Sequence, residues 1–294
     1  MTIDMMGKKR YKVNLHMHTT LSDGFKTPEE ALEMYHSQDY DAVALTDHWV
    51  YNPSGTYKGM TVLAGAEYDN CSIGDVTLRD SLDGIYHIVS IGTHTPPVLE
   101  QGMHPQQLID GIHEAGGLAI LAHPAWSLNT PEQILALSDI DATEIYNSAS
   151  AVYNARRPDS SLIVDMIATR GCILPLVAAD DTHRYHLDDC LSWIMVEAED
   201  NSEASIVKAI REQKFYATQG PEVHLTREGN EFVLRCSPAV DVAFFSNFVW
   251  SRRGFTGDGL TEVRFTPLDG ERYVRAQVID AGGKRAWTNI IPIE

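Results

Sequence analysis

The sequence predicts an α/β barrel followed by a small antiparallel β module that resembles a sandwich. Two observations indicate this fold class. Up to about residue 220, short apolar runs alternate with amphipathic helical patterns, and from Gly220-Pro221 onward strands alternate without helices. Continuous apolar strands separated by helices are typical of a parallel sheet covered by helices, and about seven such units suit a closed or distorted TIM-like barrel. We therefore expect a barrel over residues 11–221 and an all-β module over residues 222–294.

The barrel elements have recognisable boundaries. Thr27 is the expected N-cap of the first helix, with Pro28 at its first position and Glu30 completing a capping box. Gly116-Gly117 is expected to end a helix that covers residues 105–115. Further helices are expected at 160–170 and 202–213, and strands at 12–16, 41–46, 61–67, 85–93, 118–122, 143–147, 173–178 and 192–196.

The expected β module consists of short alternating strands separated by turn signals. The turns are Gly229-Asn230, Asp269-Gly270 and Gly282-Gly283. Its strands are expected at 223–226, 231–236, 240–246, 261–266, 273–280 and 287–291. Its aromatic residues suit a small core, and a lid over the barrel or a dimer surface is the alternative: Phe244, Phe245, Phe248, Trp250, Tyr273 and Trp287.

Charge and composition exclude several classes of protein. The 294 residues are 44% hydrophobic and carry 41 acidic against 23 basic side chains, a net charge of −18. A chain this acidic lacks a broad basic face for nucleic acid or anionic lipid, and no apolar run is long enough to span a membrane. Lys8, Lys9 and Arg10 precede a polar segment rather than the apolar core of a signal peptide, so we expect a cytoplasmic protein. The four cysteines are scattered and are expected to be reduced: Cys71, Cys172, Cys190 and Cys236.

Metal-ligand side chains stand at the ends of six predicted strands. His16 and His18 close the first strand two residues apart, so both imidazoles point to one face and can reach one ion. Glu67 closes the third strand and could bridge two ions. Burying so many ionisable groups at one rim without a metal would be costly. Imidazole and carboxylate donors without thiolate suit Zn²⁺, Mn²⁺ or Fe²⁺, and more than one ion. The remaining candidates are Asp23, Asp47, His48, His87, His94, His123, Asp180, Asp181 and His183.

The order of these motifs resembles the PHP (polymerase and histidinol phosphatase) superfamily. The matching segments are residues 16–19 (HMHT), 22–24 (SDG), 46–48 (TDH), 65–67 (GAE), 87–92 (HIVSIG), 122–124 (AHP) and 181–183 (DTH). The resemblance implies a distorted (β/α)7 barrel over roughly residues 11–220. It also implies two or three divalent metal ions. The implied ligands are His16, His18, Glu67 and Asp181 for the first ion, Glu67, His87 and His123 for the second, and Asp23, His48 and His183 for the third.

Three details depart from that pattern or stay open within it. Asp23 stands where relatives carry histidine, and it too can ligate. His87 matches the strand motif, and His94 is the alternative ligand or a residue facing the substrate. Asp47 and Asp180 are expected to orient imidazoles rather than to bind metal.

The resemblance implies phosphoester hydrolysis by a metal-bridged hydroxide, with Asp181, His183 and His94 as catalytic residues. The expected substrate is small: a phosphomonoester, a nucleotide 3′-phosphate or a short oligonucleotide. His183, His94 or Asp180 could protonate the leaving oxygen. Arg184, Arg156 and Arg157 are candidates for binding the phosphate. Homo-oligomerisation is left open.

Two other functions compete with this hypothesis. An amidohydrolase would cleave a C–N or C–O bond, but such enzymes usually carry a bridging carboxylated lysine. Lys58 and Lys208 fall in a loop and a helix, and Glu67 takes the bridging position. A non-catalytic, metal-stabilised binding protein is the third possibility, because competence to bind metal does not establish turnover.

Overall fold

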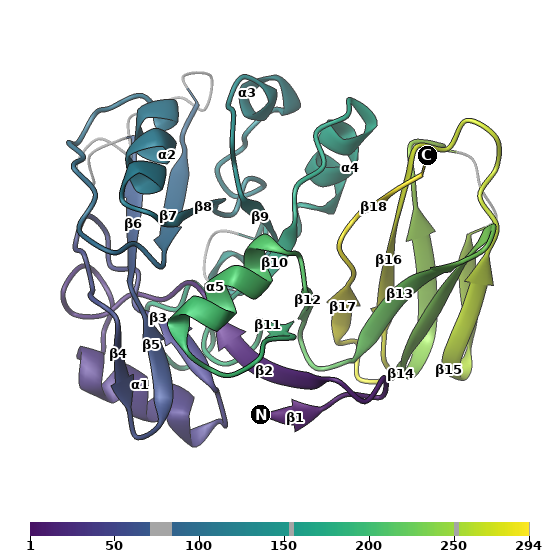
Figure 1. The fold of residues 1–294 in the computed structure, drawn as a ribbon, viewed down its shortest axis with the longest axis horizontal. Coiled ribbons are helices and arrows are strands. Elements are labelled where there is room, and N and C mark those ends of the chain that lie inside the picture. The colour runs from purple at the N-terminus through teal and green to yellow at the C-terminus, as the bar shows by residue number, and fades with distance from the viewer. Residues whose placement is uncertain (71–83, 153–155, 250–252, 294) are drawn as a thin grey trace.

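The computed structural model describes residues 1–70, 84–152, 156–249 and 253–293. It belongs to the mixed α/β class, as predicted, and has one sheet of thirteen strands and one of five (Figure 1). No closed barrel forms among the described strands, so the predicted distorted (β/α)7 barrel is not confirmed. Strand direction accounts for part of the difference, because several strands predicted to be parallel run antiparallel.

The larger sheet holds the first predicted strands in the expected parallel arrangement. Strands β2 (Lys9–Asn14), β3 (Ala42–Ala44) and β5 (Met60–Leu63) pair in parallel. On the other side of β2, strand β11 (Trp193–Val196) pairs antiparallel with both β2 and β12 (Phe215–Thr218). Strand β4 (Gly55–Tyr57), antiparallel to β5, forms one edge of the sheet, and β1 (Thr2–Ile3) pairs antiparallel with the start of β2.

The smaller sheet begins immediately after β5. Its strands, in spatial order, are β6 (Gly65–Asp69), β7 (His87–Ile91), β8 (Leu118–Leu121), β9 (Ala142–Asn147) and β10 (Leu176–Ala179). Strand β7 is antiparallel to both neighbours, whereas β8, β9 and β10 are parallel. The single strand predicted at 61–67 is therefore two strands in two sheets. Gly65 makes the crossing possible, because a Cβ there would lie 2.7 Å from the carbonyl oxygen of Leu45.

Five α-helices among the described residues pack on these sheets. Helix α1 (Pro28–Ser37) begins with the predicted capping box, in which Thr27 and Glu30 cap each other's backbone amides. Helices α2 (Pro105–Glu114) and α5 (Glu203–Arg211) lie close to their predicted ranges. Figure 1 shows α2, α3 (Pro131–Leu135) and α4 (Ser161–Thr169) beside the smaller sheet, and α1 beside β4. A 3₁₀ turn, Ala149–Ala151, follows β9.

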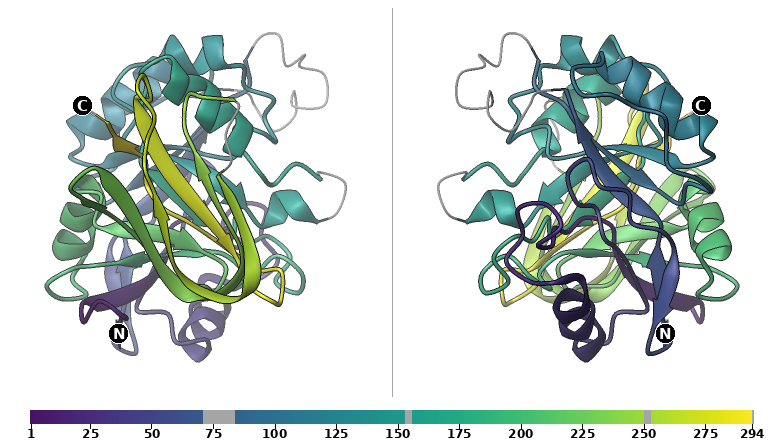
Figure 2. Two further views of the ribbon diagram at one scale, coloured as in Figure 1. Left: turned by 90° about the vertical axis from the view of Figure 1, so that its right-hand side faces the viewer. Right: turned by 90° about the vertical axis from the view of Figure 1, so that its left-hand side faces the viewer.

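The C-terminal strands are antiparallel, and the first three of them are longer than predicted. Two predicted strands are one, β14 (Glu231–Phe245), whose pairing shifts register on either side of Ala239. It pairs with β13 (Val223–Glu228), β15 (Gly254–Phe265) and β16 (Tyr273–Ile279). Strand β17 (Arg285–Trp287) joins β16 to β12, and β18 (Ile291–Pro292) pairs with β16. The left view of Figure 2 shows this curved layer from the side of β14 and β15.

The C-terminal strands also share a core with the rest of the chain. Tyr273 and Trp287 are fully buried and belong to the same apolar cluster as strands β2, β8 and β10. Arg275 is buried too, and its guanidinium lies 2.6 Å from a carboxylate oxygen of Asp165 in α4. The division at residues 221 and 222 stays a prediction.

Two further expectations from the sequence concern the cysteines and membrane-spanning helices. Cys172, Cys190 and Cys236 are free thiols, as expected, whereas Cys71 and Trp250 lie outside the described residues. In the part of the chain that is described, no helix combines the length and the apolar character that crossing a membrane requires.

Candidate metal centre

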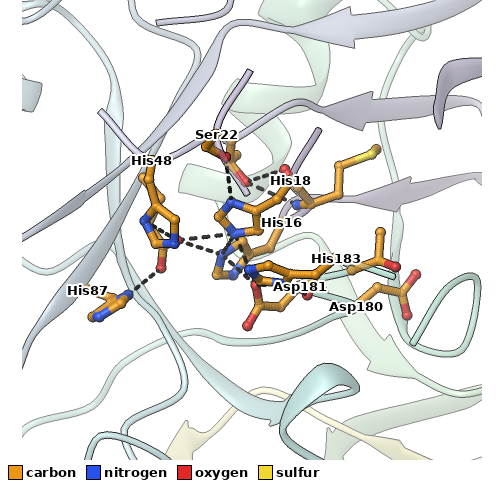
Figure 3. Close-up of polar contacts among 12 residues, drawn as sticks. His16, His18, Ser22, His48, His87, Asp180, Asp181 and His183 are labelled. Carbon is orange, nitrogen blue, oxygen red and sulfur yellow. Dashed lines mark hydrogen bonds and ion pairs between the residues drawn. The ribbon is translucent and has the colours of Figure 1, made fainter. Parts of the chain in front are cut away.

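The nine predicted ligands converge at one place, although they come from six different strand regions. His16 and His18 follow β2, His48 follows β3, and His123 follows β8. Glu67 lies within β6 and His87 opens β7. Asp181 and His183 follow β10 (Figure 3), and Asp23 lies in the loop after His18. Two isolated bridges, Met17 to Thr182 and His48 to Glu67, hold these strand ends together across the two sheets.

Glu67 lies at the middle of the cluster, with its side chain only 1% exposed. Its Oε2 atom is 3.3 Å from His16 Nε2 and 3.2 Å from His18 Nε2. The same oxygen is 3.2 Å from His48 Nδ1. Its Oε1 atom is 2.9 Å from His87 Nδ1 and 3.4 Å from His123 Nε2. One carboxylate therefore faces five imidazoles, which is the arrangement expected of a bridging ligand.

Asp181 supplies the second shared carboxylate. Its Oδ1 atom lies 3.3 Å from His16 Nε2, 3.1 Å from His18 Nε2 and 3.6 Å from His183 Nδ1. Donors bound to one ion at about 2.0–2.1 Å lie roughly 3.0–3.4 Å apart, so these separations suit a shared cation. The donors fall into four overlapping groups: His16, His18 and Asp181; His16, Glu67 and His123; His48, Glu67 and His87; and His18, Asp23, His48 and His183.

Two buried atoms of the cluster lack hydrogen-bond partners in the described part of the chain. They are Nδ1 of His48 and Oε2 of Glu67. A buried polar atom without a hydrogen bond costs about 1–3 kcal/mol, so such atoms mark a ligand or a functional site. Both atoms point into the cluster, and the residues present therefore fit divalent cations.

The electrostatics of the cluster point the same way. Burial opposes the charged form of His18, but the adjacent carboxylates of Asp181 and Glu67 outweigh it and raise its pKa to about 9. Burial likewise opposes the ionisation of Glu67, but the surrounding imidazoles hold its pKa well below the ordinary value. Burial lowers the pKa of His48 to about 4. The ionised carboxylates thus attract cations. When no metal is bound, protons take the place of the metal ions on some of the imidazoles.

Two of the predicted ligands have an unusual backbone conformation. His123 has φ of +28° and Asp181 has φ of +53°, in the left-handed region that non-glycine residues seldom adopt. Hydrogen bonds hold both: the His123 amide donates to Glu144 Oε2 at 2.9 Å, and the Asp181 amide donates to the His16 carbonyl at 2.9 Å. Strain of this kind persists where the surroundings fix it, and it is concentrated at functional sites.

The loop that carries Asp23 folds back over His18. The amides of Ser22 and Gly24 both donate to the Thr19 carbonyl. A Cβ at Gly24 would collide with the backbone carbonyl of His18, so only glycine fits there. This explains the glycine of the Ser22-Asp23-Gly24 motif and brings Asp23 Oδ1 to 3.7 Å from His18 Nδ1.

The structure separates His87 from His94. Strand β7 runs antiparallel to β6, with His87 opposite Asp69 and Ile91 opposite Gly65. His87 therefore lies at the end of the strand that reaches the cluster. His94 is at the opposite end, exposed, with its amide donating to the carbonyl of Ala115. The structure thus brings His87, and not His94, to the cluster, so this geometry does not support the predicted catalytic role of His94.

Asp180 and Asp47 also differ from expectation. Asp180 is fully buried and points away from the histidines (Figure 3), accepting hydrogen bonds from Tyr35 Oη and the amides of residues 190–192. It cannot protonate a leaving group from that position. Asp47 accepts from the Thr19 amide at 2.6 Å and from Ser22 Oγ at 2.9 Å. Both carboxylates therefore organise loops that carry ligands, rather than the imidazole rings themselves.

The three arginines lie in loops after β9 and β10. Arg184 is exposed beside His183, with its guanidinium carbon 5.8 Å from the ring centre of Phe25. Arg156 and Arg157 are exposed, and their chain follows the 3₁₀ turn, with the Arg157 amide donating to the Ser150 carbonyl. Their role in binding phosphate stays a prediction.

Three residues that support the cluster were not predicted. Glu144 lies 2.7 Å from His16 Nδ1, and Asn147 Nδ2 donates to Asp181 Oδ2 at 3.2 Å. Asp188 is buried and accepts hydrogen bonds from the amides of His183, Arg184 and Tyr185, which folds the loop that carries His183. Glu144 had a sequence signal, because it is a carboxylate within the apolar strand predicted at 143–147. Asn147, the last residue of the same strand, and Asp188, in a loop, had none.

The chain was compared with family models, curated proteins and solved structures. No family model matches the chain. The chain is 26% identical over 156 residues to an uncharacterized protein of Methanocaldococcus jannaschii, an alignment that spans 47% of this chain and 82% of the relative. An amidohydrolase from Chromobacterium violaceum, solved with bound sulfate and no metal, is 17% identical with a TM-score of 0.43, and the match covers 60% of this chain and 89% of that one.

A fuller structural match comes from Bacteroides vulgatus. It is a two-domain protein that contains a predicted PHP-like metal-dependent phosphoesterase. The two structures superpose with a TM-score of 0.57 at 15% identity, over 100% of this chain and 97% of the other. The chain thus shares its fold with that protein over nearly the full length of both.

Proposed function

We propose that this protein is a metal-dependent hydrolase of small phosphoesters, with two or three divalent ions held by the nine converging residues. The observation that carries the proposal is the position of Glu67, whose two oxygens face five imidazoles while Oε2 is buried without a hydrogen-bond partner in the described structure. His16, His18 and Asp181 would hold one ion, and Glu67 would share it with an ion near His123 and His87. Asp23, His48 and His183 would hold the third.

Divalent ions bound there would polarise phosphoryl oxygens and lower the pKa of a coordinated water. The chain's part is to fix the ligands and to shape the charge. Three carboxylates, Glu67, Asp181 and Asp23, only partly neutralise two or three dications, so the centre would be locally positive in a chain of net charge −18. Such a centre attracts a compact dianion such as a phosphate monoester, while the acidic exterior disfavours long polyanions.

His183 is the residue best placed to handle a proton at the open side of the cluster. Its Nδ1 lies 2.8 Å from the carbonyl oxygen of Asp181, which favours the tautomer with hydrogen on Nδ1. Its Nε2 then faces Asp23 Oδ2 at 3.4 Å. There it would bind the third ion when three ions are held, and would carry the proton for the leaving oxygen when only two are held. Arg184, adjacent in sequence and exposed, is the proposed partner of the phosphoryl oxygens.

A substrate screen with metal-reconstituted protein tests the proposal. The panel contains p-nitrophenyl phosphate, sugar phosphates, nucleotides, bisphosphates, short oligonucleotides, and amides and lactones as C–N and C–O substrates. We expect metal-dependent release of inorganic phosphate from a small monoester. Turnover of C–N or C–O substrates alone would favour the amidohydrolase-type reaction. Bound metal without any product would favour the non-catalytic binding protein.

A further inference from the structure

Glu144 and Asn147 lie on β9, which is the strand of the smaller sheet that contributes none of the nine predicted ligands. Glu144 is buried, and so is Asn147. Each side chain contacts a predicted ligand at the atom that faces away from the ions: Glu144 contacts Nδ1 of His16, and Asn147 contacts Oδ2 of Asp181. We propose that this pair positions the centre: Glu144 selects the tautomer of His16, and Asn147 selects which oxygen of Asp181 faces the ions. The inference rests on the metal centre proposed above.

The tautomer of His16 follows from its two neighbours. Nδ1 of His16 lies 2.7 Å from Glu144 Oε1, an atom that can only accept a hydrogen bond when the carboxylate is ionised. The ring hydrogen is therefore placed on Nδ1. Nε2 then presents a lone pair to the side where Glu67 Oε2 and Asp181 Oδ1 both lie 3.3 Å away. This is the orientation in which a neutral imidazole binds a metal.

The other oxygen of Glu144 reaches two more parts of the centre. Oε2 accepts the His123 amide at 2.9 Å and Asn147 Nδ2 at 2.8 Å. The first bond fixes the backbone of His123 where φ is +28°. A single carboxylate thus restrains two ligands that are far apart in the chain, one through its ring and one through its backbone.

Asn147 extends the restraint to Asp181. Its amide orientation is set by the Ser150 amide, which donates to Asn147 Oδ1 at 2.9 Å. Nδ2 therefore points at Glu144 Oε2 and at Asp181 Oδ2, 3.2 Å away. With Oδ2 occupied in this way, Oδ1 is the oxygen of Asp181 that approaches His16 and His18.

Replacement of Glu144 by glutamine is a sharp test because it keeps the shape of the side chain. Whichever way the amide turns, its NH₂ faces either His16 Nδ1 or the two donors now bound by Oε2. In the first case the ring hydrogen moves to Nε2 and blocks coordination, and in the second the His123 amide loses its acceptor. Loss of such supporting hydrogen bonds typically costs about 10- to 100-fold in metal affinity.

The experiment measures Co²⁺ binding to the metal-stripped full chain, by competition with a chromophoric chelator and by the visible spectrum of bound Co²⁺. We expect Glu144→Gln to weaken Co²⁺ binding about 10- to 100-fold and to change the spectrum, and Asn147→Ala to weaken it by a smaller factor. Glu271→Gln is the control for loss of a buried carboxylate elsewhere in the chain. Glu271 is also buried, in the loop between β15 and β16, where it pairs with Arg253 and accepts hydrogen bonds from Ser246 Oγ and the Leu268 amide.

Melting curves of the metal-free variants separate positioning from folding. We expect Glu144→Gln to retain a cooperative melt, and to have little further effect on Co²⁺ affinity in a His16→Ala background. If Glu144→Gln does not fold, folded Asn147→Ala with wild-type affinity overturns the inference. Wild-type affinity and spectrum in folded Glu144→Gln also overturn it, while the metal centre stands. A wild-type chain that binds no Co²⁺ overturns the proposed centre itself.

Discussion

Nε2 of His183 lies 3.4 Å from Oδ2 of Asp23, and these two side chains are the most exposed of the nine converging residues. Their side chains are 27% and 46% exposed, whereas none of the other seven exceeds 10%. The cluster is therefore closed on the Glu67 side and open on the Asp23 side. An ion held at the open side has fewer buried ligands and is the most easily lost.

Asp23→Ala should remove the ion at the open side and leave the others. We expect metal content after dialysis to fall by about one equivalent while the melting temperature changes little, because exposed substitutions usually alter stability by no more than about 0.5 kcal/mol. Asp23→His should restore the lost equivalent, since imidazole is an equally suitable ligand. Elemental analysis of the three proteins is the measurement, and a full complement of metal in Asp23→Ala would exclude this position as a site.

His87→Ala and His94→Ala should have different effects on metal content and turnover. His87 Nδ1 lies 2.9 Å from Glu67 Oε1, so its loss should lower both metal content and turnover. His94 is exposed at the other end of β7, and its replacement should leave both unchanged. Equal effects of the two substitutions on metal content would contradict the assigned strand direction.

His16→Ala and Asp181→Ala should each abolish hydrolysis and reduce bound metal, because His16 and Asp181 belong to the same group of possible ligands for one ion. His113→Ala is a suitable control, since His113 pairs with Asp141 on the outside of α2. Steady-state hydrolysis of p-nitrophenyl phosphate and elemental analysis give the result. Wild-type turnover in either ligand variant would remove that residue from the centre.

Asp180→Asn should destabilise the protein without emptying the centre. Asp180 accepts from Tyr35 Oη at 2.8 Å and from three backbone amides, and an amide group cannot accept all four. The unmatched donors should cost about 1–3 kcal/mol of the free energy of unfolding. Denaturant unfolding compares the variant with Tyr35→Phe, which removes one of the four hydrogen bonds. A loss of metal without a loss of stability would assign Asp180 to the centre after all.

Chelation should lower the melting temperature, and the effect should grow with pH. In the metal-free protein the raised pKa of His18, about 9, means that its protonated form stabilises the fold fully below pH 6.5 and that this contribution is lost as pH rises towards 9. Metal binding displaces that proton and strengthens over the same range. Melting curves with and without chelator should therefore diverge between pH 6.5 and 9, and a constant or shrinking difference would contradict the coupling.

The donors of the centre were predictable from sequence because each belongs to a short local motif. Two histidines at i and i+2 on a strand share a face in any sheet, so His16 and His18 could be paired without knowing the fold. Helix α1 was predictable for the same reason, since its capping box lies within four residues. Convergence of the strand ends then followed from the expectation that strands of one layer end at one rim.

What could not be predicted depends on contacts between distant segments. The direction of β7 is set by its pairing with β6 and β8, and no residue of 87–91 encodes it locally. For that reason the sequence alone could not place His94 relative to the cluster. The partners of Asp180 come from residues 35 and 190–192, and the joining of β17 to β12 links positions that are about 70 residues apart.

Metal content measured together with activity tests the central claim most directly. Purified protein is stripped with chelator, assayed with p-nitrophenyl phosphate, reloaded with Mn²⁺ or Zn²⁺, and analysed for bound metal. We predict two or three divalent ions per chain in active protein, no phosphate release after stripping, and recovery of activity on reloading. Full activity in protein that elemental analysis shows to be free of divalent metal would contradict the account.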